Sequence, residues 1–170
     1  GIQDAYIIEG RNAFKPNKGI ELGTSQWLTL HRFQKNSQNT VAAVETLRSR
    51  GYRIVATSPH HGDIKLEEYD LLKGPAAFFF GNELDGLSSV MKEHADEYVK
   101  IPMFGFVESF NISVSCALVL HHLIHKIREL DIDWPLKTEE KQNLLLEWLR
   151  KSIKNWRTIE AAYEAACGRD

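Results

Sequence analysis

Two polar, glycine-containing segments each follow an apolar stretch that is typical of a buried strand, which makes them the best candidates for chemistry. The first is the segment 80–88, Phe-Gly-Asn-Glu-Leu-Asp-Gly-Leu-Ser, in which Gly81 would let a ligand or another stretch of backbone approach closely. The polar pair Asn82 and Glu83 follows directly. Because parallel sheets bind ligands at the carboxyl ends of their strands, this loop is a candidate binding site. A plain strand–turn–helix connection with Ser88 as the N-cap explains the segment equally well.

The second segment, residues 101–115, leads from a strand that ends at Ile101 into a helix. A helix N-terminus presents unpaired N–H groups and a partial positive charge, so polar residues there can either cap the helix or meet a ligand. Ser109 and Asn111 both suit a cap. Phe110 between them is unusual for a simple cap, and we expect an exposed ring there to be able to cover an adenine.

Several other kinds of site find no support in the sequence. It contains no dinucleotide-binding or P-loop glycine pattern and no nucleophile elbow. His121 and His125 share a helix face, but without the H-E-x-x-H pattern or cysteines at zinc spacing we predict no metal site. The two cysteines, Cys116 and Cys167, are too few for a disulfide framework, which favours a reducing, cytoplasmic location.

The elements that must position these segments alternate between strand and helix. Periodicity and turn residues predict strands at 5–8, 27–33, 52–57, 76–80 and 97–101, and helices at 40–50, 88–94, 111–130 and 138–166. We expect residues 58–70 to form a connection. The alternation predicts an α/β fold with a mostly parallel sheet and helices on both faces, followed by a helical C-terminal extension.

Length and charge set outer limits on function. A chain of 170 residues suits one domain with an appendage, and no apolar run is long enough to span a membrane. The net charge of −2 argues against a nonspecific nucleic-acid coat, although residues 1–59 carry eight basic and four acidic side chains. A local basic patch that contacts RNA therefore remains compatible with the composition, with Arg11 among its members.

Segments 80–88 and 101–115 together resemble motifs two and three of the SpoU/TrmH family, which are RNA ribose 2′-O-methyltransferases of the SPOUT superfamily. The order and spacing of the two motifs match, and the resemblance extends more weakly from residue 1 to about residue 128. Phe110 stands where the family usually has Leu, an apolar exchange. The resemblance implies a trefoil knot at the C-terminal end of the α/β domain, S-adenosyl-L-methionine as cofactor, and a homodimer.

The resemblance also implies roles for individual residues. Glu83, Ser109 and Asn111 match the polar residues that lie near the ribose and the transferred methyl group. Residues of the knot loops would bind S-adenosylmethionine; these are Thr57, Gly81, Asn82, Ile101 and Phe110. The family's first motif pairs an Asn with an Arg that is credited with activating the ribose hydroxyl. We expect this motif to lie before residue 1, and the alternative is that the protein lacks this Arg.

The helical tail bears on which RNA is modified. We expect a knotted methyltransferase domain at 1–130 and a helical extension at 131–170, and this extension is similar to that of the tRNA guanosine-2′-O-methyltransferase branch. Arg150, Lys151 and Lys154 would then contact tRNA phosphates, or else coat an amphipathic helix. Ribosomal RNA as the substrate, or a non-catalytic RNA-binding dimerisation module, are the alternatives.

Overall fold

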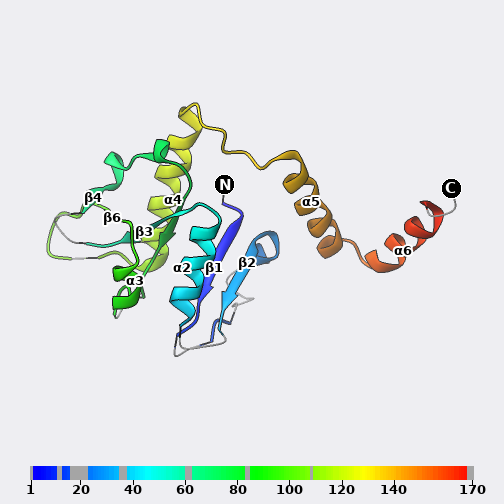
Figure 1. The fold of residues 1–170 in the computed structure, drawn as a ribbon, viewed down its shortest axis with the longest axis horizontal. Coiled ribbons are helices and arrows are strands. Elements are labelled where there is room, and N and C mark those ends of the chain that lie inside the picture. The colour runs from blue at the N-terminus through cyan, green and yellow to red at the C-terminus, as the bar shows by residue number, and fades with distance from the viewer. Residues whose placement is uncertain are drawn as a thin grey trace. The chain divides into compact units, whose positions relative to one another are not determined.

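The computed structural model describes residues 2–10, 13–15, 23–34, 38–59, 63–82, 85–107 and 109–167 (Figure 1). The chain divides into two compact units. The first contains Tyr6–Phe14 and His31–Asp133, and the second contains Ile2–Ala5, Lys15–Leu30 and Trp134–Asp170. Each unit has its own packing, and the candidate site lies wholly within the first.

A four-stranded sheet in the order β4-β6-β3-β5 forms the centre of the first unit. Its strands are β3 (Arg53–Thr57), β4 (Ile64–Lys65), β5 (Ala76–Phe79) and β6 (Glu97–Lys100). All three pairings are parallel, with Val55 opposite Phe78 in β5 and Ala56 opposite Tyr98 in β6. The carboxyl ends of β3, β5 and β6 therefore meet at one edge, as the predicted parallel sheet requires.

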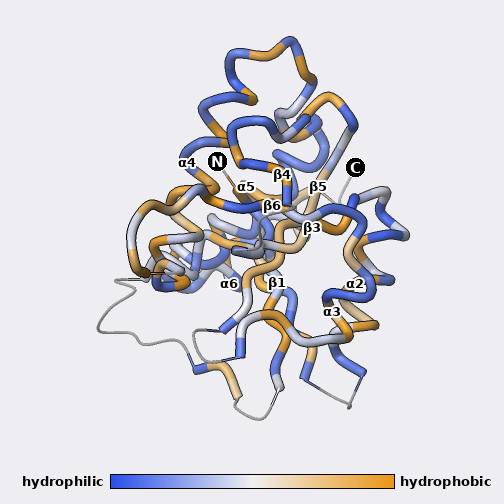
Figure 2. The backbone as a smooth tube through the Cα atoms, turned by 90° about the vertical axis from the view of Figure 1, so that its left-hand side faces the viewer, coloured by the Kyte–Doolittle hydropathy of each residue, from blue (hydrophilic) through white to orange (hydrophobic). Residues whose placement is uncertain are grey.

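Helices cover both faces of this sheet, as the sequence predicts. Because successive side chains of a strand point to opposite faces, Ile54 and Val55 belong to different cores. Ile54 packs with Val44 of α2 (Asn39–Ser49) and with residues of α3 (Ser89–Glu93). Val55 packs with Val119 of α4 (Ile112–Glu129). Figure 2 shows hydrophobic residues running through the centre of this unit.

The segment 58–70 contains more structure than the connection we predict. It holds the two-residue strand β4 and the 3-10 turn η2 (Leu66–Glu68), and a second turn, η3 (Leu71–Lys73), follows it. Leu66 and Tyr69 are buried against the α4 side of the sheet. A strand of two residues is too short to produce a hydrophobic alternation, so the sequence pattern did not reveal it.

The strands β1 (Asp4–Ile8) and β2 (Thr29–Phe33) form a separate two-stranded sheet. The Thr29 N–H donates to the Gln3 carbonyl at the start of the pair, and the Glu9 N–H donates to the Phe33 carbonyl at its end. The bonded residues thus advance in the same direction along both segments, as in a parallel pair. The predicted strand at 27–33 begins too early. Gly23 has a left-handed φ of 78° and starts the 3-10 turn η1 (Thr24–Trp27), which takes up the first predicted residue.

The C-terminal segment forms two helices, α5 (Thr138–Ser152) and α6 (Trp156–Cys167), where we predict a single one over 138–166. The break has a local cause, because Asn155 adopts a left-handed φ of 62°, a conformation that Asn tolerates better than most residues. In the described part of the chain, no helix is both long and apolar enough to cross a membrane.

The second unit holds α5 against η1 through side chains. The indole N–H of Trp148 donates to the carbonyl oxygen of Trp27 at 3.1 Å, and the two rings meet edge to face with centroids 5.7 Å apart. The ammonium group of Lys151 donates to the carbonyl of Gln26 at 2.9 Å. These contacts give α5 a structural role within its own unit.

Candidate functional site

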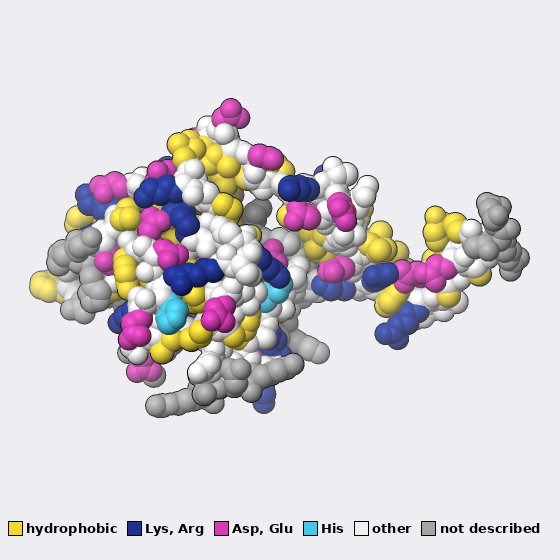
Figure 3. All heavy atoms as spheres, in the orientation of Figure 1, with side chains coloured by type: hydrophobic (Ala, Val, Ile, Leu, Met, Phe, Trp, Pro, Cys, Tyr) yellow, Lys and Arg dark blue, Asp and Glu magenta, His cyan; other side chains and the backbone are white. Residues whose placement is uncertain are grey.

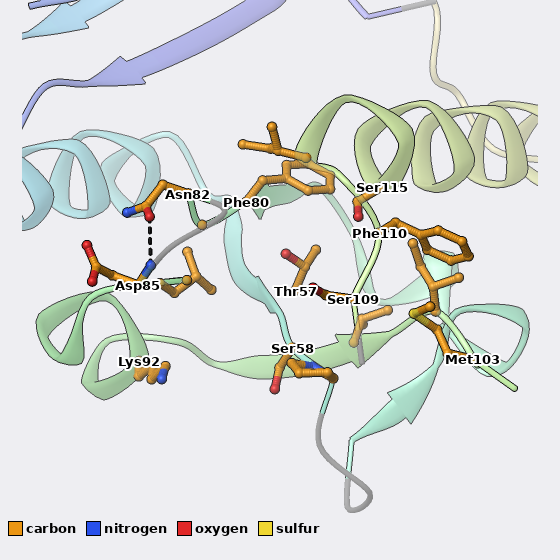
Figure 4. Close-up of a pocket in the computed structure, with 17 residues that line it drawn as sticks. Thr57, Ser58, Phe80, Asn82, Asp85, Lys92, Met103, Ser109, Phe110 and Ser115 are labelled. Carbon is orange, nitrogen blue, oxygen red and sulfur yellow. Dashed lines mark hydrogen bonds between the residues drawn. The ribbon is translucent and has the colours of Figure 1, made fainter. Parts of the chain in front are cut away.

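A pocket of about 430 Å³ opens at the carboxyl edge of the four-stranded sheet, where the chain leaves β3, β5 and β6 and enters α4 (Figure 4). Apolar side chains supply part of its lining: Phe80, Leu87, Ile101, Met103, Phe110 and Ile112. Polar side chains supply another part: Thr57, Ser58, Asn82, Asp85, Ser109 and Ser115. A cavity of this size with mixed lining suits an organic molecule that has both an apolar ring and hydroxyl groups.

The first wall is the loop that follows β5, and it is closed on itself by main-chain hydrogen bonds. Asn82 and Gly86 form an antiparallel bridge, with N–O distances of 3.2 and 3.0 Å in the two directions. The Asn82 side-chain oxygen accepts a further bond from the Asp85 N–H at 2.7 Å, which Figure 4 marks with a dashed line. Because the loop carries this internal bonding, Asn82 and Asp85 are held in place at the pocket.

Gly81 makes this loop geometry possible. A Cβ atom at Gly81 would lie only 2.1 Å from the carbonyl carbon of Gly86, well inside any normal contact. The sequence predicts that glycine at this position permits a close approach, and the group that approaches is the backbone of Gly86 and Leu87.

The second wall is the end of β3, where hydrogen bonds tie neighbouring strands together. The Thr57 hydroxyl donates to the carbonyl oxygen of Phe79 in β5 at 2.8 Å. The Ser58 N–H donates to the carbonyl oxygen of Val99 in β6 at 3.0 Å. Because the Thr57 hydroxyl proton is engaged in this way, Thr57 shapes the pocket by fixing the relative position of β3 and β5.

The third wall is the segment that leads from β6 into α4. Asn111 is the N-cap of α4, and its side-chain oxygen accepts a hydrogen bond from the Ser113 N–H at 2.8 Å. Ser109 and Phe110, just before it, line the pocket, as does Ile112 just after it. Asn111 thus performs the structural role that its position suggested, immediately beside the cavity.

The charged side chains that line the pocket include Asp85 and Lys92. Lys92 lies on α3 and Asp85 lies on the bridged loop, and in Figure 4 both lie on the opposite side of the pocket from Met103 and Phe110. A ligand that spans the pocket would therefore meet apolar groups at one end and both signs of charge at the other.

Other candidate groups lie away from this chemistry. Burial raises the pKa of the Cys116 thiol, which disfavours the reactive thiolate form. The rings of His121 and His125 meet edge to face with centroids 6.4 Å apart. Among the described residues, no group of three or more His, Cys, Asp or Glu side chains is arranged to hold a metal ion.

Comparison with known proteins identifies the family. The model of the SpoU rRNA methylase family matches residues 1–121. The chain belongs to the SpoU methylase family. A relative of this SpoU methylase, the tRNA (guanosine(18)-2′-O)-methyltransferase of Borreliella burgdorferi, is 42% identical over 160 residues, which cover 94% of this chain and 71% of the relative.

Two further matches come from Aquifex aeolicus. The protein named tRNA (guanosine(18)-2′-O)-methyltransferase is 33% identical to this SpoU methylase over 150 residues, covering 87% of this chain and 68% of that protein. The crystal structure of the A. aeolicus TrmH/SpoU tRNA modifying enzyme has a TM-score of 0.70 and 29% identity, covering 89% of this chain and 75% of that one. The α/β fold with parallel strands agrees with this neighbour.

The structure brings most of the predicted site residues of the SpoU methylase together. Thr57, Gly81, Asn82, Ile101 and Phe110, the predicted cofactor residues, all line the pocket, and so does Ser109. Asn111 lies next to two lining residues, whereas Glu83 falls outside the described residues. Their roles in binding and catalysis remain predictions.

Some lining residues were missed by sequence reasoning. Lys92 and Asp85 place charged groups in the pocket lining, and Met103 and Ser115 are two uncharged lining residues that were also missed. Asp85 sits inside the first candidate segment, so the motif itself was a signal for it. Lys92 lies on α3, one turn beyond the N-cap Ser88, and its inward position depends on how the helix docks.

The predicted RNA contacts of the tail have mixed surroundings. Arg150 forms an ion pair with Glu160 and stacks over the ring of Trp156 at 5.4 Å, and Lys151 bonds to Gln26 as described above. Lys154 is exposed. Arg11 lies outside the described residues.

Proposed function

We propose that this SpoU methylase transfers a methyl group from S-adenosyl-L-methionine to the ribose 2′-hydroxyl of a tRNA guanosine in the D-loop. The observation that carries the proposal is the similarity over 94% of the chain to a protein named tRNA (guanosine(18)-2′-O)-methyltransferase. The pocket at the carboxyl ends of three parallel strands supports it, because that edge is where such sheets bind ligands.

The pocket residues fit this cofactor by size and chemistry. About 430 Å³ lies within the usual range for sites of organic ligands. Ile101 and Phe110 offer apolar surface for a purine ring, and Ser109 offers a hydroxyl for the ribose. The Asp85 carboxylate offers a negative charge to a cationic ligand. When bound, the cofactor supplies an electrophilic methyl group on a positively charged sulfur.

The protein's own task is to present the ribose oxygen to the methyl carbon while the hydroxyl proton leaves to a base or to water. A ribose hydroxyl is a weak acid, so it attacks effectively only as its proton leaves. Holding the oxygen in line with the methyl carbon supplies a large part of the acceleration. We assign this positioning to Ser109 and Asn111, which flank Phe110 at the start of α4, together with Glu83. The Asn111 cap fixes the backbone at the start of α4, next to Ser109.

The finer architecture belongs to the same proposal. We assign the catalytic domain to residues 1–130, with a trefoil knot at its C-terminal end, and a helical extension to residues 131–170. We also propose a homodimer that acts in the cytoplasm on RNA. Exposed apolar side chains on α4, Val114 and Leu118, support self-association. Figure 3 shows further hydrophobic side chains at the surface over α5 and α6.

The test uses the full-length protein. Isothermal calorimetry with S-adenosylmethionine and its demethylated product should show binding, and no binding at millimolar ligand would refute the cofactor assignment. Transfer of labelled methyl groups to tRNA transcripts, compared with large-subunit rRNA transcripts, then identifies the substrate. The family description as rRNA methylases makes rRNA the second candidate, and methylation of rRNA alone would select it. RNA binding without methyl transfer would instead indicate a non-catalytic module.

A further inference from the structure

Two phenylalanine rings stand fully in solvent on the loop that joins β6 to α4. Phe104 is 96% exposed and Phe106 is 106% exposed, and no other large apolar side chain in the described part of the chain exceeds 69%. Single exposed apolar residues are ordinary, but two whole rings separated only by Gly105 form an aromatic surface that water solvates poorly. Such surfaces mark binding sites.

The loop places these rings beside the pocket. Met103, which precedes Phe104 directly, lines the cavity, and Ser109 and Phe110 line it where the loop returns. Because consecutive Cα atoms are about 3.8 Å apart, the Phe104 backbone lies within one residue step of the pocket wall. Figure 4 shows Met103 and Phe110 on the same side of the cavity, so the loop that carries the two rings begins and ends at that side.

We propose that Phe104 and Phe106 stack on a base of the RNA at or next to the methylated nucleotide. This inference rests on the proposed function. A ribose that enters the pocket carries its base to the mouth, where the base has lost stacking on its neighbours. The face of an aromatic side chain replaces that stacking for any base.

The composition and position of the loop favour a base over the other parts of the RNA or a protein partner. Residues 101–115 contain no Lys or Arg, so this wall makes no ion pair with phosphates. The loop begins at Met103 and returns at Ser109 and Phe110, all of which line the pocket, so a nucleotide at the pocket lies close to the backbone that carries both rings. Phe104 and Phe106 are thus positioning residues for the substrate base.

The experiment compares Phe104→Leu and Phe106→Leu with Phe104→Tyr and Phe106→Tyr in the full-length protein. Leu keeps the apolar surface and removes the aromatic face, whereas Tyr keeps both. We expect each Leu variant to weaken tRNA binding and to lower kcat/KM for tRNA by about 5- to 100-fold, while each Tyr variant stays near wild type. Calorimetric affinity for S-adenosylmethionine should not change. Leu72→Ser, which alters an exposed apolar residue of η3, is the control and should change neither quantity.

Two outcomes would overturn the inference. The Leu variants could bind and methylate tRNA like wild type, which would exclude stacking. Alternatively, Phe→Ser variants could reduce the mass measured by sedimentation while Leu variants do not, which would assign the rings to a contact between two protein copies. Failure of the wild-type protein to bind S-adenosylmethionine would refute the proposed function instead, so the two proposals fail in distinguishable ways.

Discussion

Replacing Gly81 with alanine tests the pocket loop with a single methyl group. The added Cβ would lie 2.1 Å from the Gly86 carbonyl carbon, 2.3 Å from the Leu87 nitrogen and 2.5 Å from the Gly86 oxygen. All three are main-chain atoms, so no side-chain rotation relieves the overlap. The two sides of the bridged loop, at residues 81–82 and at residues 86–87, must separate by about 1 Å or more before the contacts become tolerable.

The cost follows from the hydrogen bonds that this separation breaks. They are the two main-chain bonds between Asn82 and Gly86 and the bond from the Asp85 N–H to the Asn82 side chain. At about 1 kcal/mol for each bond, the loop loses roughly 2–3 kcal/mol. If the cofactor binds only to the formed loop, its affinity falls by roughly 30- to 150-fold. For a chain of this size the same loss lowers Tm by roughly 4–12 °C.

Calorimetry with the demethylated cofactor and thermal unfolding followed by circular dichroism measure the two effects. Alanine substitutions at two other glycines serve as controls for both measurements. A Cβ at Gly10 meets no atom within 4 Å, so Gly10→Ala should be neutral. A Cβ at Gly86 also meets open space, but its φ of +65° costs about 1–2 kcal/mol for alanine. Cofactor affinity of Gly81→Ala within threefold of wild type would refute the assignment of this loop to the cofactor site.

Three further substitutions test separate parts of the structure. Asn111→Ser keeps a cap for α4, whereas Asn111→Ala removes about 1 kcal/mol of capping. If Asn111 positions the ribose, both variants should lower the methyl-transfer rate more than tenfold and change tRNA affinity, measured by filter binding, less than twofold. An equal loss of rate and affinity would contradict that role. Trp148→Phe removes the hydrogen bond to Trp27 and should lower Tm by about 2–4 °C in a thermal melt, and an unchanged Tm would show that the contact contributes nothing. Burial raises the pKa of Tyr69 to about 12, above its unfolded value, so the folded state retains the phenol proton, and the free energy of unfolding should decrease from pH 10 to pH 12 in urea titrations. Tyr69→Phe should remove that part of the alkaline loss, and an identical pH dependence in the variant would refute it.

The position of the site was predictable because it depends on the sheet alone. The buried runs that contain Ile54 and Phe79 predict strands with both faces covered, and a parallel arrangement brings their carboxyl ends to one edge. The loops after those strands must then meet, whatever their internal geometry. For this reason Thr57, Gly81 and Ile101 line one pocket although they are far apart in the sequence.

The details of the pocket depend on contacts that no spacing encodes. Asp85 enters the lining because the Asn82–Gly86 bridge turns the loop back, and Lys92 enters because α3 docks with Met91 buried. A residue with a left-handed backbone conformation can also end a helix without any signal in the hydrophobic pattern. Asn155 divides the predicted C-terminal helix into α5 and α6, although nothing in the apolar periodicity marks the break.

The basic side chains of the C-terminal helices also look equivalent in the sequence but make different contacts in the structure. In the sequence, Arg150, Lys151 and Lys154 are equivalent candidates for contact with tRNA phosphates. In the structure, Arg150 is neutralised by Glu160, and the Lys151 ammonium holds α5 to η1 through the Gln26 carbonyl. Replacing either residue would therefore disturb the second unit as well as any RNA contact. A substitution at the exposed Lys154 separates the two effects, because a phosphate contact there changes the salt dependence of tRNA binding without changing Tm.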